Sequence, residues 1–229
     1  MPSLIRKIQT RGYWQVTVRP TNFREKRVQD IASLYPILRK ASVTLRGWDF
    51  PHLDPHKDPN IDTDWIGQAN EWQHHLSVWR FYQSGQFMHV SGMPIDWRDQ
   101  SSIWPAPKDW ATGTLLGVGD AISCFTEFFE FAARLSQTEA GDDPMQVDIT
   151  VGNLKGRRLY VDSGNRAPFF HFREASIDNF PQSVQLPRAE LLSTSRNLAL
   201  VAANELFKRF NWETTIAQLR DWQDEMIHK

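Results

Sequence analysis

The feature that most constrains the fold is an apolar run in the second half of the chain, AISCFTEFFEFAARL. Its apolar residues recur at helical spacing over so wide a face that a helix over about 120–135 must be buried on most sides. Asp120 can cap this helix, while Glu130 and Arg134 are spaced for an ion pair on its remaining stripe. We therefore expect a central core helix, with a buried face that comprises Ile122, Phe125, Phe128, Phe129, Ala132 and Leu135.

Strand patterns occur on both sides of this helix. GYWQVTVRP at 12–20 alternates apolar and polar residues and predicts a strand, and SVTLRGW at 42–48 predicts a second. Ser84-Gly85 separates two aromatic runs, so we expect a hairpin of about 75–82 and 86–92, after a short helix that begins near Trp65. MQVDITVGNLKGRRLYVD predicts another hairpin, with its turn near 153–156.

Helical spacing recurs at three other places. One helix is expected after the first strand, from an N-cap at Asn22 and kinked or shortened by Pro36. Two more close the chain, over about 188–209 and 212–227, with Asn211 placed to cap the second. Residues 163–187 and 93–118 read as irregular, the latter packed down by Trp97, Trp104 and Trp110. These patterns predict a single α+β domain over 1–229, in which antiparallel β-hairpins pack on a central apolar helix with two C-terminal helices.

Composition places the chain among ordinary globular proteins. It has 229 residues, 41% of them apolar and 23% charged, unlike disordered chains. The single cysteine, Cys124, lies in the apolar run and is expected to be a buried small hydrophobe. No stretch has the apolar length of a secretory signal or a membrane span, so we expect a cytoplasmic protein.

Charge is distributed unevenly along the chain. Residues 1–47 contain ten Lys or Arg against Glu25 and Asp30, a balance of +8 in a chain whose net charge is −1. Such an asymmetry is typical of a surface for nucleic acid or an acidic partner, although a fold can also bring the two parts together and cancel the field.

No catalytic motif has its spacing intact. The loop DFPHLDPHKDPNIDTD is rich in Asp and His, but its spacing matches no known metal motif. Gly113, Gly117 and Gly119 precede a helix as in a phosphate-binding loop, yet no Lys follows, and Asp120 would occupy the phosphate position. Six other residues are of types that act as nucleophiles, bases or paired acids, but none has a catalytic spacing, so we interpret them as structural. They are Ser84, Cys124, Glu127, Glu130, His171 and Ser195.

Aromatic content is the remaining unusual feature, because seven of the ten tryptophans lie between residues 48 and 110. Two segments, Arg46-Gly47-Trp48 and Trp79-Arg80-Phe81-Tyr82, set guanidinium groups beside rings. This pairing suits stacking on bases or on a partner protein, and buried structural contacts explain it about as well. The candidate binding residues are Arg24, Lys26, Arg27, Arg46, Trp48, Trp79, Arg80 and Tyr82.

The strings RGWDFPH, WRFYQSGQF, FEFAARL and LFKRFNW resemble a widespread, uncharacterised group of bacterial proteins, over most of residues 42–212. The resemblance implies a bacterial, cytoplasmic chain that is a partner in a multi-component system such as antiviral defence. It supplies no catalytic residue.

The leading hypothesis from the sequence is a non-enzymatic binding or assembly subunit of a bacterial multi-protein system. Its expected partner is another protein or a second copy of this chain, with nucleic acid as a further candidate for the basic N-terminal region. No cofactor, metal ligand or catalytic residue is assigned. The alternative is a metal-dependent hydrolase or nuclease that uses the Asp/His loop at 49–64.

Overall fold

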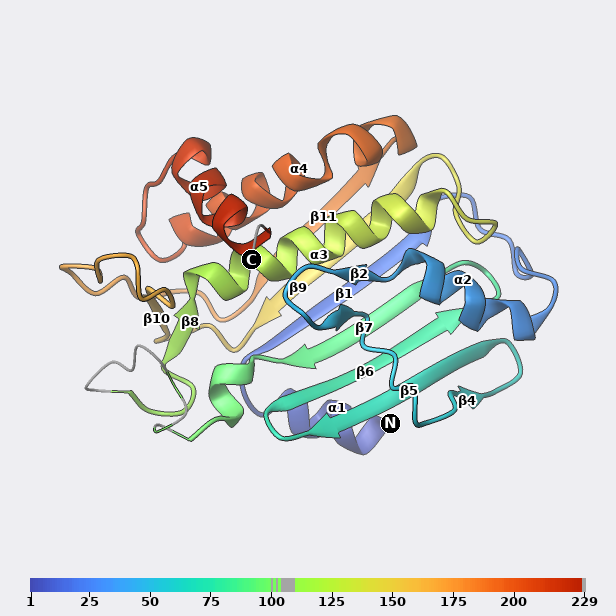
Figure 1. Ribbon diagram of the computed structural model, residues 1–229, viewed down its shortest axis with the longest axis horizontal. Helices are drawn as coiled ribbons and strands as arrows, with labels where there is room; N and C mark the ends of the chain where they lie inside the picture. The colour runs from blue at the N-terminus through green and yellow to red at the C-terminus, as the bar shows by residue number, and fades with distance from the viewer. Residues whose placement is uncertain (100, 102, 104–109, 228–229) are drawn as a thin grey trace.

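An antiparallel sheet forms one layer of the molecule in the computed structural model, which describes residues 1–99, 101, 103 and 110–227 (Figure 1). Within these residues the sheet has seven strands: β1 (Tyr13–Pro20), β4 (Asn60–Ile61), β5 (Trp65–Trp72), β6 (His75–Tyr82), β7 (Phe87–Gly92), β9 (Met145–Gly152) and β11 (Phe180–Leu186). Their spatial order is β11-β9-β1-β7-β6-β5-β4. Two short pairs lie outside this sheet, β2 (Val43–Thr44) with β3 (Asp49–Phe50) and β8 (Leu115–Gly117) with β10 (Arg158–Tyr160).

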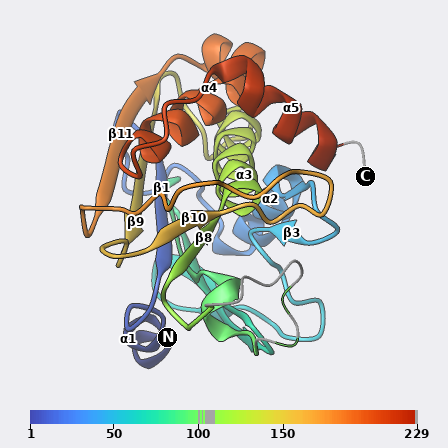
Figure 2. The same cartoon turned by 90° about the vertical axis from the view of Figure 1, so that its left-hand side faces the viewer.

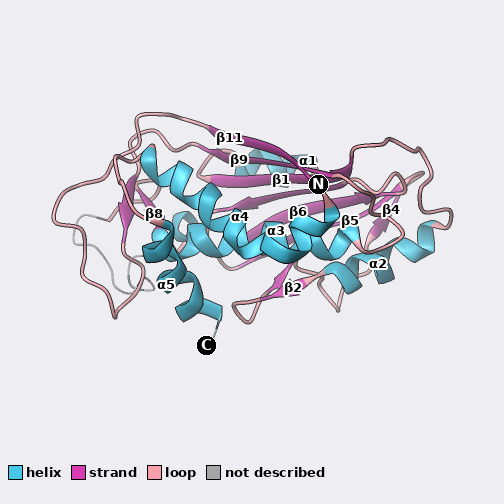
Figure 3. Cartoon of the chain, turned by 90° about the horizontal axis from the view of Figure 1, so that it is seen from above, coloured by secondary structure: helices cyan, strands magenta, loops and turns pink. Residues whose placement is uncertain are grey.

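Helices cover both faces of the sheet unequally. The central helix α3 (Val118–Ser136) crosses one face, with α2 (Leu34–Ala41), α4 (Arg188–Lys208) and α5 (Ile216–Ile227) on the same side (Figures 1 and 3). The short helix α1 (Pro2–Ile8) lies on the other face, where it packs on β6 and β7 (Figure 2). The expected α+β architecture, with helices on an antiparallel sheet and two C-terminal helices, is confirmed.

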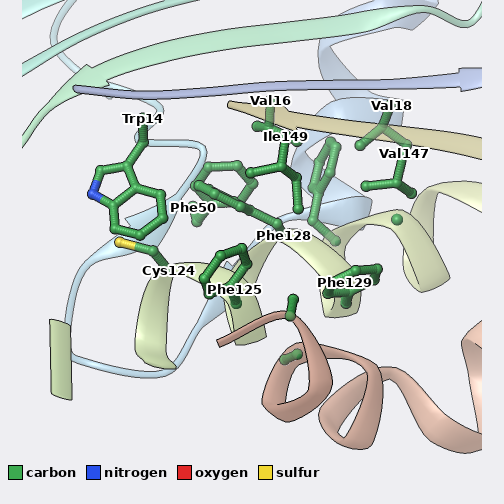
Figure 4. Packing of buried hydrophobic residues seen from close by; sticks show 14 of the residues in the cluster. Trp14, Val16, Val18, Phe50, Cys124, Phe125, Phe128, Phe129, Val147 and Ile149 are labelled. Carbon is green, nitrogen blue, oxygen red and sulfur yellow. The ribbon is translucent and has the colours of Figure 1, made fainter. Parts of the chain in front are cut away.

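The core lies between α3 and the central strands. Phe125 and Phe128 of α3 meet Trp14 of β1 edge-on, at ring-centroid distances of 5.4 and 6.1 Å. Val16, Val18, Val147 and Ile149 extend from β1 and β9 toward the same helix (Figure 4). The predicted broad apolar face of α3 is therefore buried between the sheet and α4.

The hairpin at β6 and β7 is confirmed, whereas the short helix before it is wrong because residues 65–72 form strand β5. The second expected hairpin is also wrong, because β9 pairs with β1 and β11 while β10 pairs with β8 in parallel. After β9 the chain turns through Asn153, which has a φ of 57°, and moves away from the sheet. Strand β11, in a segment expected to be irregular, is an edge strand, which is where a residue such as Pro181 is tolerated.

The first expected helix starts later than its pattern indicated. Residues 21–30 form turns rather than a helix from Asn22, and Asp30 caps the short helix η1 (Ile31–Ser33), which leads into α2. Val28, in one of these turns, is still buried, and its backbone N–H donates to the carbonyl of Gln83 (2.9 Å). Pro36 lies in the first turn of α2, where a missing N–H leaves no bond unmade.

Other expected ends also shift. The strand at 42–48 shortens to β2, and Asn211, with a φ of 55°, lies before rather than at the start of α5. The connection at 93–118 contains the short helix η2 (Pro94–Trp97) and β8, while Trp104 lies outside the described residues. None of the helices in the described part of the chain is both long and apolar enough to cross a bilayer.

Candidate functional site

A cleft of about 1220 Å³, which we call the α3 cleft, opens where the first turns of α3 face β5, β6 and β7. The segment 46–57 forms one wall, and residues 160–165 and the last turns of α5 also line the cleft. The sheet supplies the floor. Segments far apart in the sequence thus meet around one hollow, as a ligand site requires.

The floor is a polar region on an otherwise apolar sheet face. Strand pairing aligns Asn70 of β5 with Ser77 of β6, and Ser77 with Ser91 of β7. Ser91 in turn pairs with Trp14, whose ring meets α3. Since residues two apart on a strand share a face, His89 also points to this side, one row further in.

The 46–57 wall is fixed to the sheet by hydrogen bonds from buried side chains. The carbonyl of His52 accepts bonds from Trp79 Nε1 (2.9 Å) and from Asn70 Nδ2 (3.1 Å). The backbone N–H of Asp54 donates to Gln68 Oε1 (3.1 Å). Trp79, a predicted binding residue, is fully buried and therefore supports the wall from below.

A stack of aromatic rings lines the mouth of the cleft. Trp48 lies parallel to His52 and His75, with centroids 4.1 and 4.5 Å away and interplanar angles of 22° and 14°. Trp72 is parallel to Trp48 at 5.7 Å and is 54% exposed. Burial, helped by the neighbouring positive charge of Arg98, lowers the pKa of His75 to about 4, so its imidazole is neutral at pH 7.

The α3 side of the cleft is acidic and holds Arg46. The guanidinium donates from Nε and Nη2 to Glu127, both at 2.9 Å, and from Nη1 to Asp120 at 2.7 Å. Burial raises the pKa of Glu127, and Arg46 opposes that shift. Burial likewise raises the pKa of the Cys124 thiol, which keeps the sulfur protonated and unreactive.

Negative groups predominate among the described residues that line the cleft. Six carboxylates belong to Asp49, Asp54, Asp120, Glu127, Asp162 and Glu225, whereas the side chain of Glu71 points to the other sheet face and pairs with Lys7. The cations in the same lining are Arg46, Lys57 and Arg98. Arg46 pairs with Asp120 and Glu127, and Arg166 pairs with Glu225 at 2.7 Å, so these ion pairs offset part of the negative charge. The excess that remains favours a positive ligand over a phosphate.

Apart from Trp79, the predicted binding residues are distributed over three places. Arg46 and Trp48 line the cleft. Arg80, with Tyr82, lies on the opposite sheet face, where its guanidinium stacks 4.3 Å from the Trp65 ring. The exposed Arg24 and Lys26 and the almost buried Arg27 belong to the turn after β1.

The basic residues of segment 1–47 do not form one positive surface. Arg27 pairs with Asp142 at 2.8 Å, and Lys7 pairs with Glu71. Arg6, on α1, and Arg24 lie at opposite ends of the eight-residue strand β1, whose length is about 26 Å at a rise of ~3.3 Å per residue. Ion pairs and separation thus reduce the field that the sequence alone indicates.

The Asp/His loop at 49–64 supplies part of the cleft wall. His52 belongs to the ring stack, Asp54 bonds the sheet, and His56 is exposed. Across the described residues, no three His, Cys, Asp or Glu side chains are placed to share a metal ion.

Sequence reasoning missed the floor of the cleft. The signal was available, because Asn70, Ser77, His89 and Ser91 occupy alternating positions that they share with the buried Trp79 and Phe87. Polar residues on the buried face of three neighbouring strands mark a place that helices do not fully cover.

No family model matches this chain, and neither the curated proteins nor the solved structures give a significant match.

Proposed function

We propose that this chain is a non-enzymatic binding subunit that holds a positively charged segment of a partner protein in the α3 cleft. The observation that carries the proposal is the lining, in which carboxylates outnumber cations by six to three around a parallel ring stack. Lysine and arginine side chains bind such surfaces through charge and through the faces of aromatic rings. A nucleic-acid backbone would meet the same carboxylates and be repelled.

The ring stack supports a binding role because it is accessible. Trp72 is more than half exposed, although a tryptophan of this size normally buries its ring or covers it with a partner. Its neighbour Trp48, in the wall, stacks on the rings of His52 and His75, and these contacts restrict its side chain before a ligand binds. The proposal places the subunit in the bacterial cytoplasm, where a free thiol such as Cys124 is kept reduced.

Short basic, neutral and acidic peptides of equal length test the proposal, with tryptophan fluorescence as the readout. We expect the basic peptide to bind, and we expect Asp120→Asn with Glu225→Gln to weaken it about fivefold, the effect of ~1 kcal/mol from partly exposed charges. Trp72→Ala should weaken it as well. The matched control, Glu25→Gln with Glu213→Gln, removes two exposed carboxylates outside the cleft and should leave the affinity unchanged.

Two results would overturn the proposal. One is equal binding of acidic and basic peptides at low salt, and the other is basic-peptide binding that the cleft variants do not alter. Labelled single- and double-stranded DNA and RNA provide the competing ligands, and nucleic acid that binds more tightly than the basic peptide would shift the function to nucleic-acid binding.

A further inference from the structure

Two polar atoms at the inner end of the α3 cleft lack a hydrogen-bond partner within the described structure. They are Asn70 Oδ1 and His89 Nδ1, on side chains from residues that are 9% and 5% exposed. Both residues line the cleft. Buried polar atoms are nearly always bonded, and each one left unbonded costs about 1–3 kcal/mol, so these atoms indicate a missing ligand group.

Their surroundings specify a neutral group. His89 packs against the rings of Phe50 and Phe87, at centroid distances of 4.9 and 6.3 Å. This apolar contact lowers the pKa of His89 to about 3, so its neutral imidazole carries one N–H and one lone pair. A charged group placed beside it would be costly to desolvate.

The same surroundings require both a donor and an acceptor. Asn70 Oδ1 is an acceptor without a partner and needs an N–H. The amide nitrogen of the same side chain already donates to the carbonyl of His52. His89 Nδ1, as the N–H of one tautomer of the neutral ring, needs an acceptor. The hydroxyls of Ser77 and Ser91 lie in the same cross-strand row as Asn70 and Trp14 and can serve either role.

We infer that the inner end of the α3 cleft is a subsite for a planar, neutral amide, which bonds Asn70, Ser77, Ser91 and His89. A carboxamide side chain or a peptide group carries the required N–H and C=O in one plane. A nucleobase edge has the same donor and acceptor, but its phosphates would meet the acidic lining of the mouth, so the amide belongs to a peptide.

This inference rests on the proposed function and adds a spacing to it. Rows of floor residues are two strand residues apart, roughly 7 Å. The ring stack at Trp72 and His75 is one row outward from Asn70 and two rows outward from His89. An extended partner segment would therefore place its amide about two to four residues from its basic side chain.

Small probes isolate the subsite from the mouth. The full chain, with ¹⁵N-labelled imidazole rings, is titrated with propionamide, propionate and propylammonium, which share a size and differ in charge. We expect propionamide alone to shift the His89 signals. His89→Phe, with binding followed on the His52 and His75 ring signals of the same cleft, should weaken propionamide about tenfold, the effect of one buried hydrogen bond near 1.4 kcal/mol. The exposed control His171→Phe should not.

Ser91→Ala, a smaller change on the floor, repeats the test if His89→Phe fails to fold, and it should also weaken propionamide. No shift with propionamide, or equal shifts with propionate or propylammonium, would overturn the amide assignment. Uracil that binds more tightly than propionamide would reassign the subsite to a nucleobase. If basic peptides bind the mouth and propionamide does not bind, only the subsite is wrong; propionamide binding without basic-peptide binding would refute the proposed function instead.

Discussion

Asp162 caps helix α3 from outside the helix, since its Oδ1 accepts a hydrogen bond from the backbone N–H of Gly119 at 2.7 Å. Its Oδ2 accepts from the N–H of Asp120 at 2.8 Å. Asp120, the residue that the sequence indicates as the cap, is instead in the first turn and pairs with Arg46. The cap thus joins the end of β10 to the rim of the α3 cleft, and cleft geometry depends on it.

Removal of this cap should destabilise the protein. We expect Asp162→Ala to lower the free energy of unfolding by about 1 kcal/mol, because two N–H groups lose their acceptor, whereas Asp162→Asn keeps an acceptor and should cost less. Burial, with Asp120 nearby, raises the pKa of Asp162 to about 6. The folded protein therefore holds a proton that the unfolded chain releases near pH 4, so Asp162 weakens the fold as pH rises through this window.

Asparagine does not titrate, so the stability of Asp162→Asn relative to wild type should improve between about pH 4 and 7. Urea unfolding at several pH values measures the difference. A difference that stays constant with pH would contradict the raised pKa.

The buried pair of Asp96 and Arg157 should be critical for stability. Asp96 Oδ1 accepts from Arg157 Nη1 and from the N–H of Gly113, both at 3.0 Å, and its Oδ2 accepts from the N–H of Gly12 at 2.8 Å. Both side chains are at most 2% exposed. We expect Asp96→Ala or Arg157→Ala to cost about 3–5 kcal/mol, because each leaves an uncompensated buried charge.

The exposed pair of Lys208 and Glu205 is the control for that measurement. Both of its side chains are nearly half exposed, so Lys208→Ala should change the unfolding free energy by less than about 1 kcal/mol. Equal costs for the two pairs would show that the Asp96 network is dispensable.

The elements that could be predicted from sequence are those whose periodicity is local. The apolar face of α3, the alternation of β1 and the turn at Ser84-Gly85 each depend on a few neighbouring residues, and each element formed as expected. Residues 65–72 fit a helical period, and pairing of Trp65 with Tyr82 across the sheet decided for a strand. Local pattern cannot contain that information because the partner is a separate segment.

The cleft was only partly predictable for the same reason. Arg46 and Trp48 were identified as a guanidinium beside a ring, yet Arg46 is held by Glu127, a residue 81 positions later. Asp162 accepts a hydrogen bond from the N–H of Asp120, a residue 42 positions earlier. Sites assembled from distant segments become visible only when the register of the sheet is known.

The buried face of α3 gives a direct test of the core. Phe125→Ala and Phe129→Ala should each cost about 3–5 kcal/mol, since both rings are at most 1% exposed and each truncation leaves a cavity. Leu192→Ala on the outer side of α4, where the leucine is 44% exposed, should cost less than about 1 kcal/mol. Thermal or urea unfolding compares the three, and a near-wild-type Phe125→Ala would show that the face is misplaced.

The protein should bind nucleic acid weakly and only through the turn after β1. Arg24 and Lys26 are exposed on one turn, while Arg27 is engaged with Asp142, so few phosphates can be contacted together. We expect labelled DNA or RNA to show a slope of log affinity against log salt no steeper than about −2, the value for two phosphate contacts. Arg24→Glu with Lys26→Glu should abolish that binding, and a markedly steeper slope would indicate a larger basic surface than this fold presents.

The imidazoles of His75 and His89 should make the protein sensitive to acid. Burial lowers the pKa of His89 to about 3 and that of His75 to about 4, below the usual histidine value of about 6.5. As pH falls below about 6.5 the unfolded chain takes up protons that the folded protein refuses, so stability is lost as pH falls. Fully buried His89 contributes up to about 1.4 kcal/mol per pH unit, and half-buried His75 contributes less because solvent screens it.

His89→Phe removes one of these protonation sites from the unfolded chain while it keeps a ring among Phe50 and Phe87. Its unfolding free energy should therefore fall less steeply than that of wild type between about pH 6.5 and 4. The matched control, His171→Phe, changes an exposed histidine and serves as the reference slope. Urea midpoints at successive pH values give the comparison, and a His89→Phe curve parallel to wild type would mean that His89 is protonated in the folded protein and that the inner end of the α3 cleft admits charge.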